Sequence, residues 1–462
     1  MQIYAGKLFD PYTLQLLENQ VITVSPESGL VLDVQPFSIT NTNDLSGPQC
    51  IDLRHATVLP GFVDAHVHFF LHPYSEVSWE DQVTKESLVE RTVRATIHAR
   101  RTLMAGYTSV RDLGTEGAGD ADFHLRKCMS GSNAMIPGPR YFCANRAIVP
   151  TGSYAGPKST IHLNQEGIEG ITGAEVADGE VECIKAVRRQ IGAGADWIKW
   201  TITDYRFRSR MVDVSPAVSK AAITTFNEKE LHAIVSTAIN LGVKVAAHSA
   251  HWHARGHNRI ASGPGVHSVE HGQFMVFDNE TSKHLESRFP DDANKFNTIW
   301  VPTLAAYYTI GQGQGEIWES ALRAFRTALE RGVENIACGG DTGVFAHGDN
   351  ALEMKLMARA GADWRKVLKW GTLGGWTCVR SMAWEGKEGE ERLARVEELH
   401  EDARLVGDNE VPFGAVRRGF GADIIATSGD LENDFESAID KSAIEFVMKG
   451  GRVHKMGGKE LV

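Results

Sequence analysis

The chain has 462 residues and a formal net charge of −11, and hydrophobic residues make up 42% of it. This composition is typical of a folded globular protein and excludes a mainly disordered chain. Nucleic acid and anionic membrane surfaces favour basic proteins, so the acidic balance argues against both as partners. The sequence shows neither a signal-peptide pattern nor an apolar run of about 18 residues, and we expect a cytoplasmic protein.

The first sixty residues consist of short apolar strands joined by turns, with clear alternation at 21–24. A period of two predicts a small antiparallel sheet. Strand character returns near the C-terminus, at 422–426 and 443–449. We therefore predict one small β-sandwich domain that is built from both termini, residues 1–60 plus 410–462.

From residue 61 onward, helical stretches alternate with short apolar strands. The predicted helices lie at 87–105, 180–191, 228–241 and 320–331, and the predicted strands at 107–111, 197–201, 243–247, 266–270, 298–302 and 334–339. Such repeated units predict a parallel α/β fold, and their number favours a (β/α)₈ TIM barrel over residues 61–383. No GxGxxG follows the first strand, which argues against a dinucleotide-binding sheet. The charged segment 384–409 is predicted to be a solvated excursion.

Two histidines stand at the end of the first predicted barrel strand, 62–70. His66 and His68 complete the segment LPGFVDAHVH. Side chains two residues apart in a strand point to the same side, so both imidazoles would project into the barrel mouth. Neutral imidazoles are good ligands for Zn²⁺ and related ions. Taken alone, the pair also fits two half-buried histidines without a metal.

Three later strands end in the same kind of side chain. His248 follows KVAA, His271 follows SVE, and Asp341 follows CGG. Each residue is a metal-ligand type at the C-terminal edge of a predicted barrel strand, where barrel enzymes place their chemistry. Packing alone does not explain this repeated placement, so we predict a metal centre.

A lysine, Lys199, lies within the apolar strand 197–201. Burial disfavours a charged ammonium group, so the amine tends to lose its proton. A neutral amine can take up CO₂ to form a carbamate, which is a carboxylate able to bridge two metal ions. The alternative is a lysine that extends to the rim or pairs with an acid.

The order HxH, Lys, His, His, Asp resembles the amidohydrolase superfamily of metal-dependent hydrolases. The segment at 59–68 matches its best-known signature, and the resemblance covers nearly the whole chain. GADWIK at 194–199 and VEHG at 269–272 are most similar to the binuclear-metal branch, which includes imidazolonepropionase-like proteins, Xaa-Pro dipeptidases and ochratoxin amidases. The resemblance also implies a homo-oligomer.

The resemblance implies two divalent metal ions, and zinc is the expected metal. The ligands of the more buried ion would be His66, His68 and Asp341, and those of the other ion His248 and His271. The carbamate on Lys199 would bridge both ions together with a hydroxide. Asp341 would act as general acid and base, taking the proton of the hydroxide and passing it to the leaving amine.

Two residues compete for the ligand position on the fifth barrel strand. Relatives usually show HxHxxxG, whereas this chain reads HSAHWH at 248–253. Counting forward from the strand selects His248, and counting back from His271 without a gap selects His251. We expect His248, because a ligand must lie at the barrel mouth. His251 and His253 would then contact substrate, support a ligand or belong only to a loop.

A second departure from the relatives concerns the substrate. Dipeptide-cleaving relatives often carry a Gly-His-Gly loop after the third strand, and the corresponding stretch 151–156 lacks the histidine. Tyr154 in this stretch is a candidate for substrate contact. Tyr205 and Arg206 are candidates to bind a substrate carboxylate instead, and an exposed basic loop is the alternative.

We therefore predict an enzyme, an amidohydrolase, that cleaves an amide bond of a small molecule: an N-acyl amino acid, a dipeptide or a cyclic amide. One alternative is a mononuclear-metal deaminase of a heterocycle with Glu270 as proton shuttle, but such enzymes generally lack a lysine at the position of Lys199. A lactone hydrolase is another. A barrel that has lost catalysis and serves as an interaction protein is the third, and it would be expected to lack ligands.

Overall fold

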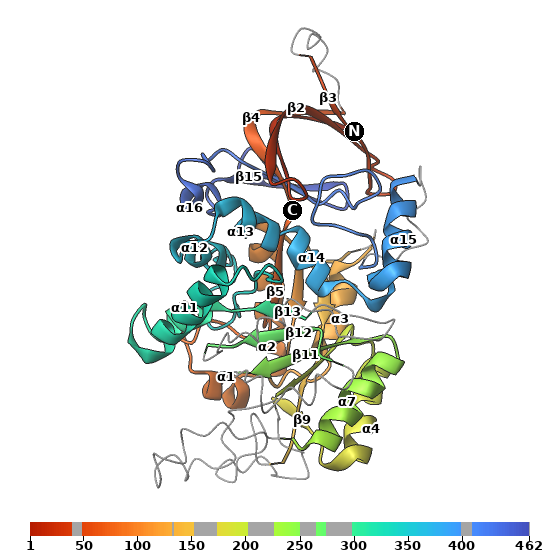
Figure 1. Ribbon diagram of the computed structural model, residues 1–462, viewed down its shortest axis with the longest axis vertical. Coiled ribbons are helices and arrows are strands. Elements are labelled where there is room, and N and C mark those ends of the chain that lie inside the picture. Colours follow the sequence, from red (N-terminus) through yellow and green to blue (C-terminus); the bar gives the residue numbers. More distant parts are fainter. Residues whose placement is uncertain are drawn as a thin grey trace.

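The computed structural model describes residues 1–38, 49–131, 134–151, 173–201, 226–249, 265–273, 298–398 and 409–461. These residues form a barrel and a separate sheet that is built from both ends of the chain (Figure 1). Across these ranges, no helix is both long and apolar enough to span a membrane.

Strands from both termini form one sheet in the order β17-β16-β15-β14-β4-β1-β2-β3. Their bounds are β1 Gln2–Asp10, β2 Gln15–Val24, β3 Val31–Pro36, β4 Cys50–Pro60, β14 Ile424–Thr427, β15 Ile444–Lys449, β16 Arg452–Met456 and β17 Lys459–Glu460. Ile3 and Val58 from the N-terminal strands share one buried cluster with Ile424, Phe446 and Met448 from the C-terminal strands. The two ends of the chain therefore build one small β domain around a common core, in agreement with the predicted β-sandwich.

The barrel strands are parallel, and each follows the previous one in the chain. They are β5 Phe62–Val67, β6 Tyr107–Asp112, β7 Arg140–Cys143 with its continuation β8 Ala147–Val149, β10 Trp197–Thr201, β11 Lys244–Ser249, β12 Ser268–His271 and β13 Ile299–Val301. The short strand β9, Ala174–Val176, pairs with β8. These buried, apolar strands are typical of a parallel sheet that is covered on both faces.

Residues 336–342, which we call the closing segment, complete the barrel between β13 and β5. Ile336 bridges Trp300, and Thr342 bridges Val67. The backbone N–H of Ala65 also donates to the carbonyl of Cys338, at 2.9 Å. Together with the order of the strands, these bonds give the predicted (β/α)₈ TIM barrel.

Helices surround the barrel strands (Figure 1). Their bounds are α1 Trp79–Lys85, α2 Leu88–Met104, α3 Ala121–Met129, α4 Gly179–Ala193, α7 Glu228–Asn240, α10 Leu304–Ile310, α11 Gly315–Glu330, α12 Leu352–Arg359, α13 Trp364–Trp370, α14 Leu373–Val379, the 3₁₀ helix η2 Met382–Trp384, α15 Gly386–Glu398 and α16 Phe435–Ala438. Local signals fix several ends. A capping box of Asn227 and Glu230 starts α7, and Gly194, with φ +115°, ends α4.

The charged segment 384–409 differs from the predicted excursion, because residues 386–398 form helix α15. Leu393 and Val396 turn one face of this helix onto the buried cluster that contains Trp384. Glu385, just before the helix, forms an ion pair with the buried Lys244 at the start of β11. The prediction followed the many charged residues of the segment and missed the helical spacing of its apolar residues. Residues 399–408 lie outside the described part of the chain, and the domain boundaries themselves stay predictions.

Candidate metal centre

The six predicted ligand residues lie at the C-terminal ends of the barrel strands. His66 belongs to β5, Lys199 to β10, His248 to β11, and His271 ends β12. His68 lies one residue beyond β5, and its backbone N–H donates to the carbonyl of Thr342, at 2.8 Å. This bond continues the strand pairing past β5, so both histidines of the HxH pair stay on the inner side.

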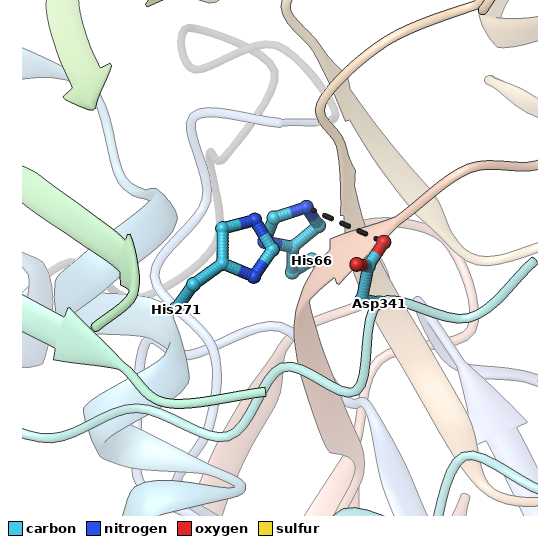
Figure 2. A group of neighbouring side chains, drawn as sticks. All are labelled: His66, His271 and Asp341. Carbon is cyan, nitrogen blue, oxygen red and sulfur yellow. Dashed lines mark ion pairs between the residues drawn. The ribbon is translucent and has the colours of Figure 1, made fainter. Parts of the chain in front are cut away.

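The side chains converge on one small region (Figure 2). Oδ1 of Asp341 lies 3.6 Å from Nε2 of His66 and 3.3 Å from Nε2 of His68. One ligand atom from each of His66, His271 and Asp341 lies within 4.8 Å of the other two. The ring centroids of His248 and His271 are 4.1 Å apart. The structure therefore brings four histidines and the aspartate together, with Lys199 beside them.

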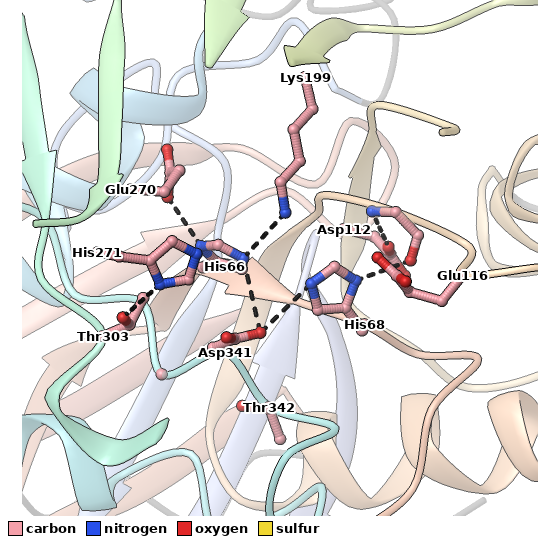
Figure 3. Close-up of polar contacts among 12 residues, drawn as sticks. His66, His68, Asp112, Glu116, Lys199, Glu270, His271, Thr303, Asp341 and Thr342 are labelled. Atoms are coloured by element: carbon pink, nitrogen blue, oxygen red, sulfur yellow. Dashed lines mark hydrogen bonds and ion pairs between the residues drawn. The ribbon is translucent and has the colours of Figure 1, made fainter. Parts of the chain in front are cut away.

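In three of these rings, Nδ1 contacts an oxygen atom, and the kind of oxygen differs from ring to ring (Figure 3). Nδ1 of His66 lies 2.9 Å from a carboxylate oxygen of Glu270, and Nδ1 of His68 lies 2.8 Å from the carbonyl of Gly114. Nδ1 of His271 lies 2.8 Å from the hydroxyl of Thr303. A proton on each Nδ1 would satisfy these contacts and leave Nε2 free to bind a metal.

The carboxylate of Glu270 is fixed in turn by Arg111 from β6. Nη2 of Arg111 donates to Oε1 of Glu270 at 2.7 Å, and the hydroxyl of Ser268 donates to the same oxygen at 2.6 Å. The guanidinium also stacks 4.3 Å from the centre of the Trp197 ring. Both members of the ion pair are fully buried. Arg111 and Thr303 were not predicted, because their partners are far away in the sequence.

Asp64 supports the two chain segments that carry His66 and Asp341. Its carboxylate accepts four hydrogen bonds, from the backbone of His66 and Gly340 and from the side chains of Thr342 and Asn350. Burial raises its pKa to about 6, although these hydrogen bonds act in the opposite direction. Asp341 itself has a positive φ of 60°. The bonds to Asp64 help to hold this unfavourable backbone in place.

The charges of the site suit the binding of cations. Burial, together with the charge of Lys199, lowers the pKa of His66 well below its ordinary value and that of His248 to about 3. Burial likewise lowers the pKa of His271. Burial alone would raise the pKa of Asp341, but the neighbouring His66, His68 and Lys199 outweigh it and hold this pKa low. Burial lowers the pKa of His68 as well, but the contact with Asp341 outweighs burial and raises it. Three neutral imidazoles beside an ionised carboxylate are donors that divalent metal ions prefer.

Lys199 is 4% exposed, and its amine points at the same region (Figure 3). Its Nζ lies 3.4 Å from Nε2 of His66, and burial lowers its pKa despite the acids nearby. Among the described residues, no carboxylate comes within ion-pair distance of this nitrogen. Within the described part of the chain, the lysine therefore neither extends to the rim nor pairs with an acid.

The predicted substrate-contact residues lie outside the described part of the chain, so the structure does not place them. They are Tyr154, Tyr205, Arg206, His251 and His253. Of the two candidates for the fifth-strand ligand, His248 is described and lies beside His271. His251 lies outside the described residues, so the structure does not compare the two.

Comparisons with known proteins show the family of the chain and its fold. The profile of the amidohydrolase family matches residues 57–381. The ochratoxinase of Aspergillus niger is 25% identical over 486 aligned positions, which cover 99% of this chain and 87% of that protein. A crystal structure of a Xaa-Pro dipeptidase with methionine bound in its active site matches with a TM-score of 0.74 and 27% identity, over 98% of this chain and 99% of that one. The crystal structure of the A. niger ochratoxinase, at 23% identity over 98% of this chain and 95% of that one, shows the same fold with a TM-score of 0.72.

Proposed function

The chain belongs to the amidohydrolase family and is a hydrolase that acts on C–N bonds, and we propose that its substrate is an amide of a small molecule. N-acyl amino acids, dipeptides and cyclic amides are the candidate classes. The observation that carries this proposal is the convergence of four histidines, one aspartate and one buried lysine at the mouth of the barrel.

His66, His68 and Asp341 are proposed to hold one divalent ion, and His248 and His271 the other, with zinc as the expected metal. The lowered pKa values of His66, His248 and His271 support this role, since only a neutral imidazole binds a metal. Two bound ions supply Lewis acidity to a carbonyl group and lower the pKa of a water molecule, which provides a nucleophile at neutral pH.

Lys199 is proposed to carry a carbamate that joins the two halves of the site. Its neutral amine would add to the carbon of CO₂, forming an N–C bond and losing one proton to solvent. The product is a carboxylate at the end of a fixed side chain. Its burial, its lowered pKa and the absence of an ion-pair partner among the described residues support this modification.

Asp341 is proposed to move the proton during hydrolysis. One carboxylate oxygen takes a proton from the attacking water and then delivers it to the nitrogen of the leaving amine. The C–O bond forms and the C–N bond breaks, so an amide yields a carboxylic acid and an amine. Its low pKa keeps the carboxylate ionised before the reaction, as this role requires.

The alternative of a deaminase with Glu270 as proton shuttle is less favoured. Both oxygens of Glu270 are engaged, one with His66 and the other with Arg111 and Ser268, and the side chain is fully buried. A proton shuttle needs an oxygen that reaches the reacting atoms.

A substrate panel tests the proposal. We suggest N-acyl amino acids, dipeptides including Xaa-Pro, ochratoxin, a cyclic amide and a lactone, each incubated with the zinc-loaded enzyme while the formation of amine, or of the hydroxy acid from the lactone, is followed. The proposal predicts metal-dependent amine release from at least one amide class and none by the Asp341→Asn variant. Turnover confined to the lactone, or ammonia release from a heterocycle, would contradict it.

A further inference from the structure

A threonine beside the site departs from the usual geometry of a helix start. Thr303 is the N-cap residue of α10, yet its side chain caps no backbone N–H. An N-cap residue normally has extended backbone angles, which turn its oxygen toward the first turn of the helix. Thr303 instead has φ 51° and ψ 44°, a left-handed conformation that is rare for a β-branched residue. Such strain persists where the surroundings enforce it.

The strained backbone directs the hydroxyl of Thr303 elsewhere. Its Oγ1 lies 2.8 Å from Nδ1 of His271, and the residue is fully buried (Figure 3). His271 also has a positive φ, of 74°. The indole N–H of Trp300 donates to the carbonyl of His271 at 2.8 Å. The ends of β12 and β13 are therefore joined by two hydrogen bonds, one to the ring and one to the backbone of the histidine.

Glu353, rather than Thr303, caps the N-terminus of α10. Glu353, in the first turn of α12, accepts the backbone N–H of Ala305 through Oε2 at 2.7 Å, and it also bonds the N–H of Leu304. Glu353 is 1% exposed. A buried carboxyl group far away in the sequence thus satisfies donors that a threonine N-cap would otherwise serve. This leaves the hydroxyl of Thr303 available for the histidine.

We propose that Thr303 is a positioning residue that holds the His271 ring in the orientation that binds metal, and that Glu353 permits this by capping α10 in its place. The inference rests on the proposed metal centre. When the proton of His271 lies on Nδ1, this N–H donates a hydrogen bond to Oγ1 of Thr303, and Nε2 is left as the ligand atom.

Zinc affinity of the full chain tests the inference, measured by competition with a chromophoric chelator. Thr303→Val removes the hydroxyl at nearly constant volume, and we expect one of the two zinc ions to bind roughly 10–100-fold more weakly. Thr303→Ser keeps the hydroxyl and should restore the affinity. Thr309→Val is the matched control, because it removes a hydroxyl that, among the described residues, bonds only the helix carbonyl of Ala305, at 2.7 Å. Zinc affinity should not change.

Three further variants keep the test informative if Thr303→Val folds poorly. Glycine adopts a positive φ without strain, so Thr303→Gly should fold well and still bind zinc more weakly. If the role of Thr303 were purely structural, this variant would keep its zinc affinity. Glu353→Ala removes the cap and should weaken zinc binding, whereas Glu353→Gln keeps an acceptor and should bind zinc nearly as the wild type does.

The outcome also separates this inference from the metal centre itself. His271→Ala removes the ligand and should abolish one zinc site. If His271→Ala loses an ion while Thr303→Val and Thr303→Gly bind both with wild-type affinity, the positioning role is wrong and the metal centre stands. If His271→Ala changes nothing, both proposals are wrong.

Discussion

The amine nitrogen of Lys199 lies 3.4 Å from Nε2 of His66, inside the barrel and without a carboxylate partner among the described residues. This amine and this ring nitrogen are buried together, next to the carboxylate of Asp341. A bound cation, or an acid group added to the amine, would give these buried polar atoms partners. The first prediction follows from this contact.

Lys199 should carry a carbamate. We expect a ¹³C carbamate signal when the protein is incubated with ¹³C-bicarbonate, and its loss in Lys199→Ala together with at least ~100-fold lower amide hydrolysis, a larger effect than losing a supporting residue. Lys244 on the neighbouring strand is the control, because its amine is paired with Glu385. A signal that persists in Lys199→Ala, or disappears in Lys244→Met, contradicts the assignment.

His248, rather than His251, should be the ligand from the fifth strand. Its ring lies 4.1 Å from that of His271, and burial keeps it neutral. Metal analysis of His248→Ala should show one zinc fewer per chain than the wild type, and His251→Ala should retain both. The reverse pattern would assign the ligand to His251.

The contributions of Arg111 and Glu270 to the free energy of unfolding should be strongly coupled. Removing one member of a buried ion pair leaves an unpaired charge and costs about 3–5 kcal/mol. We expect Arg111→Met and Glu270→Gln each to lower the free energy of unfolding of the metal-free protein by about this amount, with the double variant well short of the sum. Denaturant unfolding measures the cycle, and strictly additive losses would show that the pair acts independently.

Asp122 should make stability depend on pH. Burial, together with the charge of Asp112, raises its pKa to about 7 from an ordinary value of 3.8. Between these values the folded state holds more protons than the unfolded state, so the free energy of unfolding should fall as pH rises from about 4 to about 7. Asp122→Asn lacks this group. The stability of the variant relative to the wild type should therefore increase over that range, and an unchanged difference would show that the carboxyl group titrates normally.

Much of the site could be predicted because its ligands follow a local rule. His66, His271 and Asp341 each stand where an apolar strand ends, and parallel strands bring these ends to one rim of the barrel. Alternation along β5 also placed His68 beside His66. Such patterns are visible within ten residues of sequence, and the strand spacing suggested the barrel that joins them.

The supporting residues could not be predicted in this way. Arg111 contacts Glu270, which is 159 positions away, and Glu353 caps a helix that begins 49 positions earlier in the chain. Contacts of this kind depend on how the elements pack. The positive φ of Thr303 also has no sequence signal, since threonine at a helix start normally indicates an ordinary cap. The small-molecule substrate, the homo-oligomer and the cytoplasmic location stay predictions.

Zinc titration of the metal-depleted enzyme measures whether amide hydrolysis depends on two ions bound at this site. Amine release from the best amide of the substrate panel would be followed as zinc is added in steps to the chelator-treated chain. We expect no hydrolysis before zinc is added, and we expect the rate of amine release to reach a plateau at about two ions per chain. Full activity in the metal-depleted chain, or no activity at any zinc concentration while the ions bind, would contradict it.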